Sequence, residues 1–217
     1  MTENHPQNSA TERARILSVM ARANDILRLQ ETDEMIKGML DLLVEITLAD
    51  SANLFQLDTS TNDLVITHIR GDSESQHLVG LRLNRERGLP GAVLCETRVA
   101  VVGDLTSEPS WLLAADPERA ARKRNIINLP IANKEQTLGV IQLYNFQQAE
   151  LDLLTVLVEA LAMEMSRRKE VDSMRQSNQR LIKLTDMMSE LAGTLDRNRL
   201  LHLVTESASR LVGAERS

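Results

Sequence analysis

One uninterrupted helical periodicity near the C-terminus limits the fold more than any other feature. The period begins near Gln148 and runs to about Leu195, which corresponds to about 45 residues or about 70 Å of α-helix. No compact domain that a chain of 217 residues can form encloses a helix of that length. The helix must therefore leave the domain that precedes it, and its apolar side chains need a partner outside that domain.

Residues within this helix follow a heptad pattern. Their spacing alternates between three and four, as it does between the a and d positions of a coiled coil, at Val171, Met174, Asn178, Leu181, Thr185, Met188, Ala192 and Leu195. Asn178 is a polar residue at an a position, which is favoured when it pairs with its twin in a parallel dimer. All but the weak core residues Thr185 and Ala192 form the predicted dimer seam. The alternative is a solvated helix whose spacing is accidental.

The region before the long helix mixes helical and strand periods. Helical stripes cover residues 11–27 and 33–46, with Thr32 or Asp33 as the expected cap of the second helix. Alternating or continuous apolar runs predict strands at 53–57, 64–69, 78–83, 99–102, 126–131 and 137–144. Pro90 is placed to open a short helix. Helices at both ends, hairpins between them and no βαβ alternation predict the α+β class.

Composition excludes several classes of protein. The formal net charge is −6 and only four aromatic residues occur, which argues against a nucleic-acid binder. A single cysteine excludes an intrachain disulfide framework. No apolar run approaches the roughly 18 residues of a membrane span, and the N-terminus lacks a signal-peptide pattern. We therefore expect a cytoplasmic protein with neither nucleic acid nor membrane as a partner.

The end of the chain resembles its beginning. Residues 200–216 align without a gap on residues 35–51, and the chain stops where the first copy continues into a strand. We infer a fragment of a longer protein with tandem copies of one domain, followed by an output domain. The expected organisation is a disordered lead at 1–10, a mixed domain at 11–165, a coiled-coil helix at 166–196 and a truncated second domain at 197–217.

Several short motifs carry a family resemblance over about residues 35–168. They are the sequence Leu-Ala-Asp-Ser-Ala at 48–52, Gly-Leu-Pro-Gly-Ala-Val at 88–93, Val-Val-Gly-Asp at 101–104, Glu-Pro-Ser-Trp at 108–111, and the strand pair at 124–131 and 138–145. Because these motifs occur in this order and at this spacing, the chain resembles a GAF domain followed by a signalling helix.

This resemblance implies a GAF/PAS-like fold with a central antiparallel sheet of about five to six strands. Helices would lie on one face, and the other face would hold a small-ligand pocket beneath residues 104–124. The pocket candidates are Trp111, Arg124 and Asn128. The resemblance implies no catalytic residue, metal or fixed cofactor, and an unknown small molecule as the ligand.

Two other members of the family offer narrower alternatives. The strand at 124–127 is similar to that of cyclic-nucleotide-regulated GAF domains, which also carry an Asn-Lys…Phe…Asp-Glu signature. Here Phe146 follows Asn145 directly, and Glu150-Leu151 replaces the acidic pair. GAF proteins that reduce free methionine sulfoxide use a cysteine and a resolving partner, and Cys95 alone lacks the second step. We expect Cys95 to be a buried structural residue.

The sequence thus predicts a non-catalytic sensory module of a larger signalling protein. It would bind a small ligand and relay the signal through a parallel dimeric helix to an output domain, by analogy a histidine kinase or diguanylate cyclase. The main alternative is a ligand-free dimerisation scaffold. A cavity of about 300 Å³ or more with convergent polar groups would favour the sensor, and a filled interior would favour the scaffold.

Overall fold

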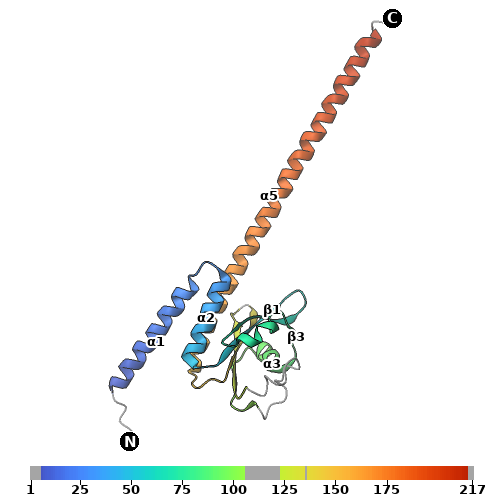
Figure 1. Cartoon of the computed structure of the whole chain (residues 1–217). Helices are drawn as coiled ribbons and strands as arrows, with labels where there is room; N and C mark the ends of the chain where they lie inside the picture. Colours follow the sequence, from blue (N-terminus) through green and yellow to red (C-terminus); the bar gives the residue numbers. More distant parts are fainter. Residues whose placement is uncertain (1–5, 106–122, 135, 215–217) are drawn as a thin grey trace. The chain divides into compact units, whose positions relative to one another are not determined.

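The computed structural model describes residues 6–105, 123–134 and 136–214 of the chain (Figure 1). Contacts divide the chain into two units, Met1–Ser166 and Arg167–Ser217. The first unit contains the sheet, and the second consists of the C-terminal part of one helix. None of the described helices combines the length and apolarity that a bilayer crossing requires.

The first unit is built on a six-stranded sheet in which all neighbouring strands are antiparallel. Its order is β3-β2-β1-β6-β5-β4. The strands are β1 (Ser51–Asp58), β2 (Asp63–Arg70), β3 (Arg82–Asn84), β4 (Ala100–Val102), β5 (Ile126–Ala132) and β6 (Thr137–Tyr144). The α+β class and the antiparallel sheet of about five to six strands are therefore confirmed.

Three helices cover one face of this sheet. They are α1 (Pro6–Leu27), α2 (Thr32–Thr47) and the beginning of α5 (Leu151–Ala214). The apolar stripe of α2 is buried because its members recur at helical spacing, as Met35, Ile36, Met39 and Leu43 do. These helices pack on alternate side chains of the central strands, namely Ala52, Leu54, Ile127, Leu129, Ile131, Ile141 and Leu143.

The opposite face is covered by shorter elements. The 3-10 helix η1 (Ser73–Leu78) and the helix α3 (Gly88–Glu96) contribute Leu78, Val93 and Leu94 to a second core. This core contains the residues of β1, β2 and β6 that point away from the long helices, namely Phe55, Leu64, Ile66, Ile69 and Val140. The sheet is therefore buried on both faces, and the described elements on the second face are short.

Some local expectations were wrong. The N-cap of α2 is Glu31, without a side-chain bond, because Asp33 instead contacts Lys37 and His68. The expected strand at 78–83 is largely replaced by η1 and a turn, and strand pairing is limited to β3. The side chain of Asp72 accepts the backbone N–H of Ser75, and this bond stabilises the turn of η1.

Helix α5 extends further than its sequence pattern indicated. It continues without a break to Ala214, past the end expected near Leu195. No proline occurs between residues 151 and 214, and Gly193 and Gly213 each cost only about 1 kcal/mol in a helix interior. A second domain at 197–217 stays a prediction, as do the other domain boundaries.

Cys95 is exposed, so the expectation of a buried cysteine was wrong. Helix α3 turns Pro90, Gly91, Val93 and Leu94 towards the core. Because consecutive helical residues are about 100° apart, Cys95 falls outside that buried face.

Candidate functional site

Polar side chains form a row across the sheet face that η1 and α3 cover. Asn53 of β1 and Asn128 of β5 both pair with Gln142 of β6, which lies between them. All three are buried, and Asn128 is fully inaccessible to solvent. Two residues further along these strands, on the same face of the sheet, Ser51 of β1 pairs with Tyr144 of β6. Burying polar side chains in a core costs free energy of folding unless their polar atoms are hydrogen-bonded.

Hydrogen bonds connect most of this row. Gln142 donates from Nε2 to Oδ1 of Asn128 at 2.7 Å, and its Oε1 accepts the Tyr144 hydroxyl at 2.5 Å. Burial raises the pKa of Tyr144, although a hydrogen bond with Asn53 acts against that rise. Within the part of the chain that the structure describes, Nδ2 of Asn128 has no partner. The row therefore ends in a buried amide donor whose hydrogen-bonding capacity is unused.

Lys123 connects the buried row to the surface. Its ammonium lies 4.6 Å from the centroid of the Tyr144 ring, a cation–π distance. It also donates to Oγ of Ser51 at 2.9 Å and lies 3.6 Å from a carboxylate oxygen of Asp72. The lysine side chain is only 16% exposed. A mostly buried ammonium is held here by an aromatic ring on one side and oxygen atoms on the other.

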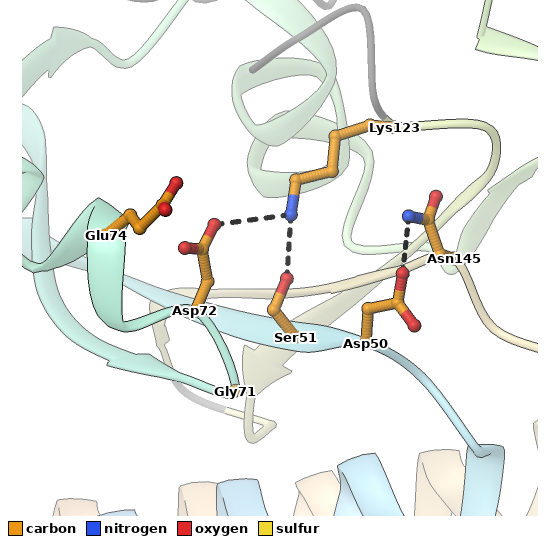
Figure 2. Close-up of a pocket in the computed structure, with 7 residues that line it drawn as sticks. All are labelled: Asp50, Ser51, Gly71, Asp72, Glu74, Lys123 and Asn145. Atoms are coloured by element: carbon orange, nitrogen blue, oxygen red, sulfur yellow. Dashed lines mark hydrogen bonds and ion pairs between the residues drawn. The ribbon is translucent and has the colours of Figure 1, made fainter.

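A pocket of about 230 Å³ opens beside this lysine, at the ends of β1, β2, β5 and β6. Figure 2 shows Lys123 reaching between Asp72 and Ser51, with Asp50 and Asn145 forming a second hydrogen-bonded pair nearby. The described residues that line it are Asp50, Ser51, Gly71, Asp72, Glu74, Lys123 and Asn145. The described part of this small cavity is thus lined by three carboxylates and one ammonium.

Backbone geometry fixes the pocket walls. Gly71 has φ +80°, and a Cβ atom there would collide with the carbonyl of Asp50. Asn145 also has a positive φ, +55°. Its side chain donates to Asp50 at 2.7 Å and accepts the backbone N–H of Arg124 at 2.6 Å. The turn after β6 is therefore tied to the segments before β1 and β5, so the wall is preorganised.

The three residues predicted from sequence have different positions. Trp111 lies outside the described residues. The side chain of Arg124 is exposed, and its backbone N–H holds Asn145 in place. Asn128 belongs to the buried polar row. Whether any of them contacts a ligand stays a prediction.

Sequence reasoning missed Asp72 of the pocket lining, and Tyr144 and Gln142 of the buried row. One signal was available, because Asn53, Asn128 and Gln142 interrupt otherwise apolar strands. Strand pairing was needed to show that these interruptions lie side by side.

Replacing Tyr144 with phenylalanine should lower the free energy of unfolding by about 1–2 kcal/mol, because Oε1 of Gln142 loses its donor. Burial holds the folded-state pKa of Tyr144 above the usual tyrosine value of about 10. Its contribution to stability is therefore complete below about pH 10 and falls as the pH rises further. Urea unfolding of the wild type and of Tyr144→Phe, at neutral and at alkaline pH, measures the difference in their free energies of unfolding.

Tyr144 is the only tyrosine, so tyrosinate absorbance reports directly on its ionisation. If the tyrosinate signal of the folded protein appears at the pH of free tyrosine, the phenol is not buried as described.

Comparison with known proteins agrees with the fold. The model of the GAF domain family matches residues 30–165. The chain therefore belongs to the GAF domain family, a family of sensory and regulatory modules in signalling proteins that are generally non-catalytic. No curated protein matches the chain in sequence.

Solved structures with the same fold include GAF domains of phosphoenolpyruvate-protein phosphotransferases. The domain from Acinetobacter has a TM-score of 0.62 at 16% identity, covering 73% of this chain and 96% of that one. The domain from Coxiella burnetii has a TM-score of 0.63 at 19% identity, with the same coverage. Free methionine-R-sulfoxide reductase from Neisseria meningitidis, in complex with its substrate, has a TM-score of 0.58 at 18% identity. That similarity covers 70% of this chain and 89% of the reductase.

Proposed function

We propose that this chain is the sensory part of a larger signalling protein, and that the pocket beside Lys123 binds its small-molecule ligand. The GAF domain would occupy residues 11–165, the signalling helix 166–196 and the start of a second GAF domain 197–217. The supporting observation is the continuity between the open pocket and the buried polar row through Lys123 and Tyr144. A ligand that displaced Lys123 would therefore act on the centre of the sheet.

The lining favours a small ligand with a positively charged group. At about 230 Å³ the cavity is below the roughly 300 Å³ at which drug-sized sites begin, although its polar groups converge as a binding site requires. Among the described lining residues three carboxylates face one ammonium, so this part of the lining carries excess negative charge. That charge disfavours the phosphate of a cyclic nucleotide and favours an amine or a zwitterion.

Relay through a homodimer is supported by the exposed apolar side chains of α5. Within the second unit, Met174 is 70% exposed, Leu181 62% and Met188 70%. These three occupy d positions of the predicted seam, together with Leu195, whose side chain is not described. Large apolar residues in one row on a long helix indicate a missing partner. A parallel second copy would cover them and carry a change of register to an output domain, such as a histidine kinase or diguanylate cyclase.

Native mass spectrometry of the purified chain tests both parts of the proposal, since it reports subunit number and retained ligand together. Thermal unfolding with small primary amines, zwitterionic amino acids and carboxylic acids then identifies the chemical class. A ligand at about 100 times its dissociation constant stabilises by about 2.7 kcal/mol. We expect amines or zwitterions to stabilise the wild type, and Glu74→Gln to weaken the effect.

The matched control is Glu96→Gln, which removes a carboxylate from an exposed position outside the pocket lining. It should respond to ligand as the wild type does. A dimer that carries no ligand and is stabilised by none of the three compound classes would instead establish the dimerisation scaffold.

A further inference from the structure

The helix α5 meets the sheet through an apolar face with one polar exception. Its buried residues in the first unit include Leu154, Leu157, Val158 and Leu161. Ser166, the last residue of that unit, is only 4% exposed. A buried hydroxyl in an apolar interface requires specific partners, and here the partners come from the sheet.

Both partners lie in the turn between β5 and β6. Asn133 donates from Nδ2 to Oγ of Ser166 at 2.8 Å, and Gln136 donates from Nε2 to the same oxygen at 3.2 Å. The turn itself is held by the side chain of Asn133, which accepts the backbone N–H of Gln136 at 2.9 Å. We call the three residues Asn133, Gln136 and Ser166 the hairpin clamp.

The two strands that end in this clamp also carry the candidate ligand site. Lys123 precedes β5 and Asn145 follows β6, so both pocket residues lie at the opposite end of the same hairpin. Between the two ends, β5 and β6 are paired along their whole length and carry Asn128 and Gln142. A shift of the hairpin at the pocket is therefore passed along the strands to the turn.

Apolar contacts and hydrogen bonds constrain a helix differently. Apolar packing is non-directional, so the apolar face of α5 tolerates small rotations. Hydrogen bonds weaken steeply away from their preferred distance and angle. Two donors that converge on one hydroxyl therefore define how α5 is oriented where it leaves the sheet.

We propose that the hairpin clamp couples the pocket to helix α5, with Ser166 as the positioning residue that transmits movement of the β5–β6 hairpin to the helix. This inference rests on the proposed function, because it names the contacts through which a ligand in the pocket would act on helix α5. It requires no particular ligand and no second subunit.

Amide hydrogen exchange in the full chain tests the coupling without a ligand. Lys123→Met removes the ammonium from the pocket but keeps an apolar stem on the Tyr144 ring. With the clamp intact, this change should alter exchange of residues 158–166 by at least about fivefold, the lower end of coupling between sites. In a Ser166→Ala background the same change should have an effect within about twofold, as independent sites do.

Two further variants separate the clamp from general loosening of the helix. Thr155→Ala removes another α5 hydroxyl, which donates to the carbonyl of Leu151 in its own helix at 2.7 Å, and coupling should persist. Gln136→Ala removes a donor from the turn and should reduce coupling as Ser166→Ala does. Asp72→Asn supplies a second pocket change if Lys123→Met does not fold.

The proposal is overturned if the pocket variants alter α5 equally with and without Ser166. It is also overturned if they leave α5 unchanged while the clamp is intact, or if Thr155→Ala abolishes the effect. Failure of ligand binding would appear in mass spectrometry and thermal unfolding instead, so it remains distinguishable from failure of the clamp.

Discussion

Gly139→Ala is expected to destabilise the domain by about 3 kcal/mol, although alanine replaces a single hydrogen with a methyl group. Gly139 lies in β6 and pairs with Gln56 of β1, so it is at the junction of the two central strands. A Cβ atom there would fall inside the contact distance of the Phe55 carbonyl oxygen and 3.0 Å from its carbonyl carbon. Both obstacles are backbone atoms, so the strands themselves would have to move apart.

This expected loss of stability is opposite in sign to the usual effect of replacing glycine with alanine. Where the backbone tolerates it, glycine to alanine stabilises a protein by about 0.4–1 kcal/mol, because the unfolded chain loses freedom. Gly103→Ala is the matched control, since a Cβ at Gly103 would meet no atom of the described residues within 4 Å. Urea unfolding should show a large fall in midpoint for Gly139→Ala and almost none for Gly103→Ala. Equal midpoints would mean that β1 and β6 are not packed as described.

Met188→Glu is expected to raise the dissociation constant of the proposed dimer at least about 100-fold, equivalent to about 3 kcal/mol. Met188 is a d position of the predicted seam, so two glutamates would face each other in the dimer core. Burial of uncompensated charge opposes association. The folding of the single chain should not change, because the Met188 side chain is 70% exposed in it. Analytical ultracentrifugation across a concentration series measures the constant.

Met187 supplies a closely matched control. It is the same residue type, its neighbour in the sequence and 59% exposed, but it occupies a c position facing away from the seam. Met187→Glu should leave the dissociation constant close to that of the wild type. If both variants dissociate equally, or neither does, the helices do not associate through this seam.

The pocket and the hairpin clamp lie at opposite ends of the same hairpin. The β5–β6 pair is central enough to be rigid, and both its ends carry polar contacts. The proposed coupling uses this paired hairpin as its route from one end to the other. The buried amide of Asn128, with its unused donor, lies between them and leaves the row open to rearrangement.

Local patterns predicted what depends on neighbours in the sequence. The helices α1 and α2 and the strands β1, β2, β5 and β6 follow from period and turn residues, and the long helix follows from its heptads. The cap of α2 and the strand at 78–83 were wrong, because Asp33 and Asp72 found partners that compete with those local preferences. Such partners are invisible until the chain has folded.

The sequence by itself determined the α+β class, the exit of a long helix and the series of elements, because each depends on hydrophobic periodicity over a short window. Only the tertiary structure decided the site. Lys123, Tyr144 and Asp72 come from three separate segments, and strand register alone brings Asn53, Gln142 and Asn128 into one row. The register of a sheet depends on pairings between distant residues, and a shift of one position would turn every one of these side chains to the other face.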